Sequence, residues 1–322
     1  MRSIAVVNQK GGVGKTTTAV NVSAALTRAG RRVLLIDMDP QAHSTLHLGI
    51  ELGPDDKSTY DVLIGAAPLA ATARIVADGL TVVPAHIDLV AAEVELAGLP
   101  ERELILANAV AGYTDAFDFL IIDGGPSLGL LTINALAAVE EVIIPLQPHF
   151  LALQGLGKLL ETVSLVRGVL RPTLRVSGVV LCMYETGTRL AQEVQSDVSR
   201  FIRDAEYQDA WYGARVFETF IRRNIKLAEC PSFGQTVFDY APRCHGAEDY
   251  AALAGEILAM DRQEPTLQPV EPVEAAVGIV AGPVTKAEDV VHPASEPVEP
   301  GPPTTVPADD ARQDVAVPRT AD

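Results

Sequence analysis

The stretch "VVNQKGGVGKTTTAV", residues 6–20, decides the fold of this chain. It places a glycine-rich turn between a β-branched run and a segment of helical spacing, which is the strand, loop and helix order of a phosphate-binding loop. In such a loop, backbone N–H groups and the first helical turn point at a bound phosphate. The predicted contacts are Gly11, Gly12, Val13, Gly14, Lys15, Thr16 and Thr17.

This loop contains two lysines. Lys15 is expected to contact the β- and γ-phosphates as a point charge, and the Thr16 hydroxyl is expected to join the coordination shell of Mg2+. The ordinary pattern GxxxxGK[ST] would require glycine at Gln9, whereas this loop has Lys10 five residues before Lys15. From the residues alone, Lys10 is either a solvated loop charge or a second phosphate contact.

The body of the chain, residues 1–262, alternates short β-branched runs with longer segments of helical spacing. This pattern predicts an α/β fold, with a predominantly parallel sheet and helices on both faces. The expected strands are 3–7, 32–36, 80–83, 117–122, 141–145 and 176–183. The expected helices are 16–29, 152–170, 189–203 and 247–260.

The end of the chain differs in composition. Residues 263–322 carry eleven acidic residues against three basic ones, eleven of the 22 prolines and no Phe, Trp or Tyr. Such a segment cannot bury enough apolar surface to offset the entropy of ordering, so we predict a disordered acidic tail. Its role is either solubilisation or binding of a partner and screening of DNA.

Several classes of protein are excluded by composition. No run approaches the roughly eighteen apolar residues of a membrane span, and no apolar signal region opens the sequence, so we expect a cytoplasmic protein without membrane attachment. The three cysteines, Cys182, Cys230 and Cys244, are far apart and show no CxxC spacing. They predict neither a disulfide framework nor a zinc site.

Two further stretches place carboxylates at the ends of expected strands. "RRVLLIDMDPQ", residues 31–41, contains Asp37 and Asp39, and "FDFLIIDGGPS", residues 117–127, contains Asp123. The carboxyl ends of parallel strands face the ligand crevice of an open α/β sheet. Asp123 is therefore expected to hold a Mg2+-bound water. The DxD pair alone could also be a loop cap.

The run "KGGVGKT", residues 10–16, resembles the deviant Walker A motif of the ParA/MinD family of ATPases. The resemblance implies a P-loop NTPase that uses ATP and Mg2+ and forms a homodimer in the ATP state. Lys10 occupies the position of the lysine that reaches the nucleotide of the opposite subunit. Such a cation, supplied across an interface, offsets charge in the phosphoryl-transfer transition state.

The same resemblance assigns roles to the carboxylates. Asp39 is expected to position the attacking water, and Asp37 to lie on the Mg2+ and phosphate side. Gly124 and Gly125 depart from the residues that the family commonly has there, which broadens the backbone freedom of this segment.

Residues 126–163 and 222–258 are similar to the ParA/Soj chromosome-partition branch. That branch implies nucleoid association, ATP-dependent binding to nonspecific DNA and a ParB-like partner that stimulates hydrolysis. Basic side chains would neutralise DNA phosphates, and the DNA-binding candidates are Arg189, Arg222, Arg223 and Lys226.

Two alternatives stay open. The chain could position a protein cluster or organelle instead of DNA, using the same nucleotide switch. It could also be a DNA-independent regulator that acts through protein contacts at residues 217–226.

Overall fold

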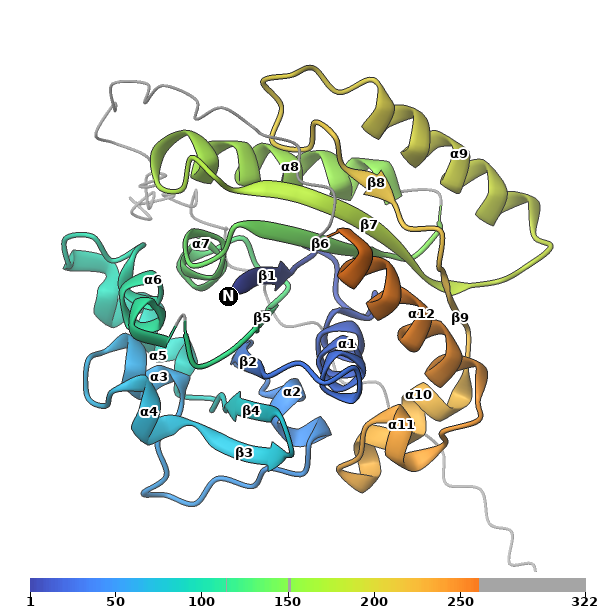
Figure 1. Cartoon of the computed structure of the whole chain (residues 1–322). Coiled ribbons are helices and arrows are strands. Elements are labelled where there is room, and N and C mark those ends of the chain that lie inside the picture. Colours follow the sequence, from blue (N-terminus) through green and yellow to red (C-terminus); the bar gives the residue numbers. More distant parts are fainter. Residues whose placement is uncertain (114, 150–151, 261–322) are drawn as a thin grey trace, which may run out of the picture. The chain divides into compact units, whose positions relative to one another are not determined.

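The computed structural model describes residues 1–113, 115–149 and 152–260 (Figure 1). The predicted tail, residues 263–322, and the predicted domain boundary at residue 262 both lie outside the described residues.

The described residues form a mostly parallel sheet in the order β3-β4-β2-β5-β1-β6-β7-β8, and β9 also pairs with β7. Only β3 runs antiparallel to its neighbour among the strand pairs of this part of the chain. The strands are β1 Arg2–Val6, β2 Val33–Met38, β3 Arg74–Ala77, β4 Leu80–Val83, β5 Phe119–Gly124, β6 Glu141–Leu146, β7 Arg175–Tyr184, β8 Arg215–Val216 and β9 Ile221–Arg222.

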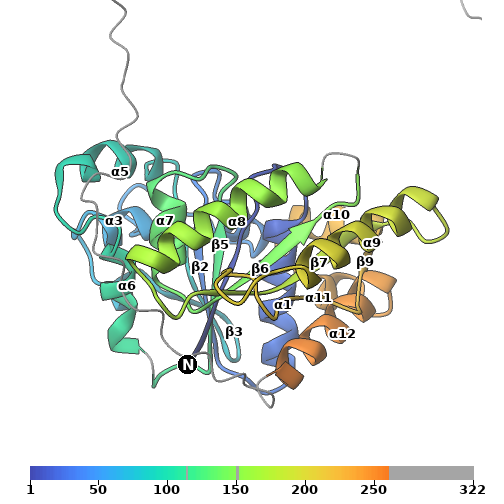
Figure 2. The same cartoon turned by 90° about the horizontal axis from the view of Figure 1, so that it is seen from above.

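Helices cover both faces of the sheet (Figures 1 and 2). The α-helices are α1 Lys15–Arg28, α2 His43–His47, α3 Thr59–Leu63, α4 Leu69–Thr72, α5 Leu89–Glu95, α6 Ile105–Val110, α7 Leu130–Ala137, α8 Ala152–Val169, α9 Arg189–Arg203, α10 Ile225–Glu229, α11 Val237–Tyr240 and α12 His245–Met260. Short 3-10 turns are η1 Leu96–Gly98, η2 Ala111–Tyr113 and η3 Cys230–Phe233.

The core consists of two apolar layers, one on each face of the sheet. Alternate residues of β2 enter different layers, because successive side chains of a strand point to opposite faces. Leu34 and Ile36 belong to the layer that also holds buried residues of α7, α8 and α9, whereas Val33 and Leu35 belong to the layer that holds buried residues of α1 and α12. The central strands are therefore buried on both faces, which explains their continuous apolar sequences.

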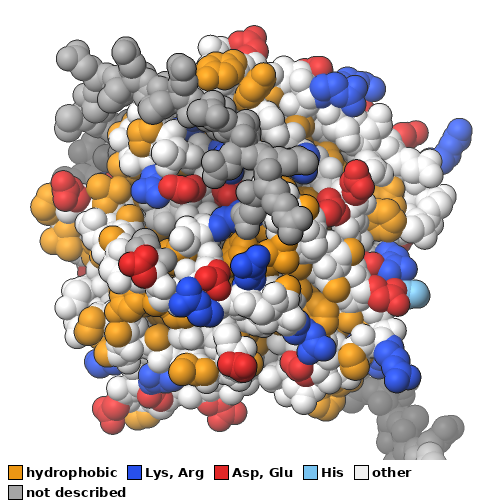
Figure 3. All heavy atoms as spheres, in the orientation of Figure 1, with side chains coloured by type: hydrophobic (Ala, Val, Ile, Leu, Met, Phe, Trp, Pro, Cys, Tyr) orange, Lys and Arg blue, Asp and Glu red, His pale blue; other side chains and the backbone are white. Residues whose placement is uncertain are grey.

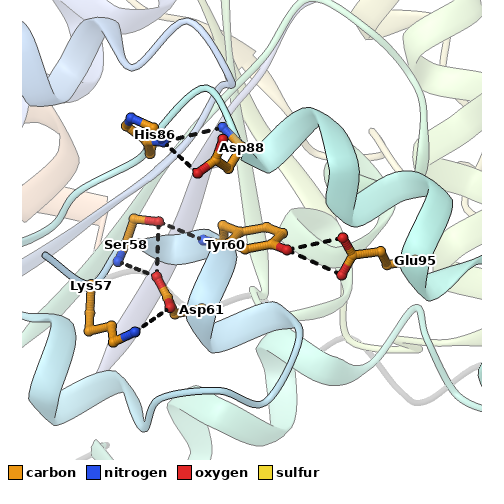
Figure 4. A network of polar contacts seen from close by, with 7 residues as sticks. All are labelled: Lys57, Ser58, Tyr60, Asp61, His86, Asp88 and Glu95. Atoms are coloured by element: carbon orange, nitrogen blue, oxygen red, sulfur yellow. Dashed lines mark hydrogen bonds and ion pairs between the residues drawn. The ribbon is translucent and has the colours of Figure 1, made fainter. Parts of the chain in front are cut away.

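The short helix α3 is fixed by a polar network (Figure 4). The Ser58 hydroxyl accepts a hydrogen bond from the Tyr60 N–H, and the Asp61 carboxylate accepts one from the Ser58 N–H, which together form a capping box. The Tyr60 hydroxyl donates to Glu95 at the end of α5, 3.0 Å away. This network holds α3 beside α5.

The predicted α/β architecture is confirmed, and each expected element is present with small shifts at its ends. The expected strands 32–36 and 117–122 end too early, because β2 and β5 keep pairing up to Met38 and Gly124. Asp37 and Asp123 therefore lie inside the sheet, directly opposite each other. The edge strand β3 and the helices between β2 and β6 were not predicted.

Candidate nucleotide-binding site

The glycine-rich loop joins the end of β1 to the start of α1, as predicted. Gly12 and Gly14 have φ angles of 73° and 95°, a backbone region that residues with a side chain rarely adopt. A Cβ atom at Gly12 would meet nothing within 4 Å. At Gly12 the backbone conformation, and not crowding, is what favours glycine.

Lys15 is buried at the base of this loop, with 6% of its surface exposed. Its ammonium group donates a hydrogen bond to the Lys10 carbonyl, 3.0 Å away. Burial lowers the pKa of Lys15, while the negative charges of Asp123 and Asp39 act in the opposite direction. The structure therefore brings the loop lysine and the two predicted carboxylates into one electrostatic environment.

The side chain of Lys10 has different surroundings, since it is exposed. Its backbone N–H donates to the Asn8 side chain, which in turn donates to the Pro145 carbonyl on β6, 2.7 Å away. Its Nζ lies 2.5 Å from Nε2 of His149. The loop backbone is thus tied to β6 while the Lys10 amine faces the surface.

Asp37 is fully buried and accepts hydrogen bonds from protein donors on both carboxylate oxygens. The Asp39 N–H donates to Oδ1 at 3.1 Å, and the backbone and hydroxyl of Thr45 donate to Oδ2 at 2.9 and 2.7 Å. Burial raises the pKa of Asp37 to about 6, against the effect of these hydrogen bonds. In this structure Asp37 organises the segment that leads from β2 into α2; its assignment to the Mg2+ side stays a prediction.

Asp123 is also fully buried, but only one of its oxygens has a partner. Ser44 Oγ donates to Oδ2 at 2.8 Å, whereas Oδ1 is buried without a hydrogen-bond partner among the described residues. Burial and the neighbouring charge of Asp37 raise the pKa of Asp123 to about 8, and the hydrogen bond from Ser44 acts in the opposite direction. A buried acceptor without a donor calls for an ion or water, so Oδ1 and the Thr16 hydroxyl fit a Mg2+ ion with its waters.

Asp39 follows β2 and lies against the backbone that follows β5. Its Oδ1 accepts a hydrogen bond from the Gln41 N–H at 2.9 Å. A Cβ atom on Gly125 would lie 3.5 Å from the Asp39 carboxyl carbon. The two strand ends thus place Asp39 and Asp123 near Lys15; their roles toward a nucleotide stay predictions.

A cavity of about 490 Å3 opens beside the first turn of α1. Gly14 and Thr17 line it on the loop side, Arg222 and Arg223 line it from β9 and the following residue, and Tyr250 lines it from α12. Sequence reasoning missed this cavity because its walls come from four distant parts of the chain, the fourth being Cys182 and Met183 of β7. It also missed Ser44 and Thr45, which carry no motif of their own.

The four predicted DNA-binding residues are unequal in their surroundings. Arg222 pairs with Asp249 at 2.5 Å, and the Asp249 side chain is only 9% exposed. Arg223 pairs with Glu185 at 3.0 Å on exposed side chains, and Lys226 pairs with Glu229 at 2.7 Å on half-buried ones.

Arg189 begins α9 and is exposed, so it belongs to a different element from the other three. On the face shown in Figure 3, basic and acidic side chains are interspersed.

A parallel sheet, a glycine loop with a buried lysine and carboxylates at two adjacent strand ends define a P-loop nucleotide-binding protein. A family model described as an AAA domain matches residues 1–176. Over 263 residues the chain is 44% identical to the chromosome-partitioning ATPase Soj of Treponema pallidum, covering 81% of this chain and 99% of that protein. Over 257 residues it is 44% identical to the sporulation initiation inhibitor protein Soj of Bacillus subtilis, covering 80% and 98%.

Solved structures agree with this assignment of the fold. The cobyrinic acid a,c-diamide synthase of Mycobacterium smegmatis, solved with an ATP analogue and magnesium, is 35% identical, with a TM-score of 0.70 over 84% of this chain and 99% of that chain. The present chain belongs to the ParA/Soj family of ATPases, which confirms the resemblance seen in residues 10–16. Within the described ranges, no helix has the length and apolar character that crossing a bilayer requires.

Proposed function

We propose that this chain is a DNA-partition ATPase whose ATP-bound homodimer binds nonspecific DNA at the nucleoid and is released when a ParB-like partner stimulates hydrolysis. The observation that carries the proposal is the pair of unlike lysines: Lys15 is buried in its own loop, and Lys10 presents its amine at the surface. The Soj relatives support partition as the process, since they share 44% identity, against 35% for the synthase structure.

The nucleotide would be ATP with Mg2+, as in the magnesium-bound neighbour. Lys15 would contact the phosphates, and Thr16 and Asp123 Oδ1 would hold the ion and its waters. Mg2+ would supply charge neutralisation on the transferring phosphoryl group. Asp39 would orient the attacking water, and Lys10 of a second copy of this chain would add positive charge across the interface.

The cavity beside α1 would take the nucleoside, because Gly14 and Thr17 connect it directly to the phosphate loop. Its far wall is the Arg222 and Arg223 segment, which continues into α10 with Lys226. Nucleotide binding would therefore contact the same segment that carries the DNA-binding candidates.

Arg223 and Lys226 are the DNA contacts that the geometry favours. Arg223 forms an exposed ion pair, and such pairs contribute about 0–1 kcal/mol, so exchange of Glu185 for a DNA phosphate costs little. The pair of Lys226 with Glu229 is half-buried, and Tyr240 also donates to Glu229. Arg222 is less suited to this role. If its guanidinium moved to a DNA phosphate, the nearly buried carboxylate of Asp249 would lose its ion-pair partner.

The test is a gel shift on arbitrary DNA, with ATP or ADP, across a salt series. Wild-type protein should bind only with ATP and lose affinity as salt rises. Arg223→Glu should lose DNA binding by roughly tenfold or more, because it places a negative charge against DNA phosphates. Nucleotide binding by this variant is measured alongside, because Arg223 also lines the cavity proposed for the nucleoside. Arg74→Glu is the matched control. Arg74 begins the edge strand β3 and forms an ion pair with Asp56 at the surface.

Three results would change the proposal. If the wild-type protein bound DNA equally well with ATP and with ADP, binding would not be controlled by the nucleotide. If it did not bind DNA with either nucleotide, a DNA-independent regulator would be favoured. Full binding by Arg223→Glu would place the DNA contact elsewhere.

A further inference from the structure

We propose that Ser44 is a positioning residue for the Mg2+ side of the nucleotide site. Its hydroxyl fixes the Asp123 carboxylate by one oxygen, which leaves the other oxygen oriented for the ion and its waters. This inference rests on the proposed role of Asp123, and it adds a residue that the phosphate-loop and strand-end motifs do not contain.

The contact itself is specific and buried. Ser44 Oγ donates to Asp123 Oδ2 at 2.8 Å, although the two residues are 79 positions apart in the chain. Both residues have 0% exposure, so no bulk water competes for this hydrogen bond. Because Oδ1 has no partner among the described residues, the Ser44 bond is the hydrogen bond that limits rotation of this carboxylate.

The helix that carries Ser44 is itself held in place. Ala42, which precedes α2, has a φ of 51°, an uncommon conformation for alanine, and its N–H donates to the Asp39 carbonyl at 2.8 Å. Thr45 donates twice to Asp37, and its hydroxyl accepts from the Ala85 N–H at 2.9 Å. Thr45, the residue after Ser44, is thus anchored on β2 and on Ala85, the second residue after β4. This anchoring directs Ser44 toward β5.

One consequence is that Ser44 joins the two carboxylates proposed to act on ATP. Asp39 lies on the turn that leads into α2, and Asp123 is the next-to-last residue of β5. The Ser44 hydroxyl is a direct side-chain bond from α2 to Asp123, so it sets the orientation of one carboxylate relative to the segment that carries the other. Removing a group that orients a metal ligand in this way commonly lowers metal affinity by roughly 10–100-fold.

The experiment measures Mg2+-dependent binding of a fluorescent ADP analogue to the full chain, with no turnover involved. For each variant, Mg2+ is titrated at fixed nucleotide, and the concentration for half-maximal binding is read. Ser44→Ala should raise this concentration about tenfold or more, while binding at saturating Mg2+ is retained. Ser44→Cys, which fills the same space with a weaker donor, should also raise it, and Ser44→Thr, which keeps the hydroxyl, should stay near wild type.

Two controls separate the possible failures. Ser23→Ala removes another fully buried hydroxyl, one that bonds to the Ala19 carbonyl within α1, and should leave the Mg2+ requirement unchanged. Asp123→Asn should raise the requirement at least as much as Ser44→Ala.

A normal requirement in both Ser44→Ala and Ser44→Cys, with Asp123→Asn impaired, would overturn the role of Ser44 alone. A normal requirement in Asp123→Asn would overturn the proposed function of Asp123. If Ser44→Ala does not fold, Ser44→Cys decides between these outcomes.

Discussion

Lys10 and Lys15 show how two identical side chains acquire different roles from their surroundings. Lys15 is 6% exposed and has a lowered pKa because burial disfavours its charge. Lys10 lies in the same loop, but its side chain is exposed and contacts His149. The exposed amine is accessible to a second copy of the chain and the buried one is not, which is consistent with the separate roles proposed for the two lysines.

His47 provides a prediction of pH-dependent stability. It lies in α2 with 2% exposure, and burial lowers its pKa from 6.5 to about 4. Between pH 6.5 and about pH 4, His47 is protonated in the unfolded chain and neutral in the folded chain. Its contribution to stability is therefore lost as the pH falls from about 6.5 to about 4. The maximum effect is about 3 kcal/mol, on the order of 1.4 kcal/mol per pH unit.

The measurement is the free energy of unfolding in urea from pH 7.5 to pH 4.5 for wild type and His47→Gln. The wild type should lose more stability than the variant over this range. Parallel pH profiles would contradict a buried neutral His47.

At the scale of elements, α2 connects the nucleotide site to the segment after α10. Ser44 and Thr45 hold the strand-end carboxylates, and two residues further on His47 Nε2 lies 3.5 Å from Sγ of Cys230 in η3. The backbones of Gly49 and Gly234 meet just beyond, where a Cβ on Gly234 would lie 2.8 Å from the Gly49 Cα.

Gly234→Ala should therefore destabilise the fold. The residue has a φ of 62°, and the added methyl group would also displace the backbone of Gly49. We expect a loss of about 2–4 kcal/mol in the free energy of unfolding, since strain and overpacking each cost roughly 1–3 kcal/mol. Gly213→Ala is the matched control, because Gly213 has a φ of 76° and nothing within 4 Å of the added atom. Equal losses in the two variants would refute the close packing of α2 against η3.

The elements that sequence analysis predicted are those whose signals are local. The strands carry continuous apolar runs, and the phosphate loop has its glycines and lysines in one segment, so both were found. The edge strand β3 and the short helices α2 to α6 were not, because each is too short for a periodic pattern and is stabilised by contacts with distant residues. The Ser44 contact with Asp123 and the cavity walls were not predicted for the same reason, because each joins residues that are far apart in the sequence.

At the scale of the whole molecule, an acidic protein is proposed to bind a polyanion. The full chain has a formal net charge of -17. Binding must then depend on a local basic surface and on its duplication in a dimer, because the overall charge repels DNA.

The mass of the chain in solution tests the central claim most directly. Size-exclusion chromatography with light scattering would be run with ADP and with a non-hydrolysable ATP analogue, for wild type, Lys10→Ala and the exposed-lysine control Lys57→Ala. We expect wild type and Lys57→Ala to double in mass only with the ATP analogue, and Lys10→Ala to bind the nucleotide yet keep the mass of one chain. A Lys10→Ala dimer, or a wild-type monomer saturated with the analogue, would contradict the account.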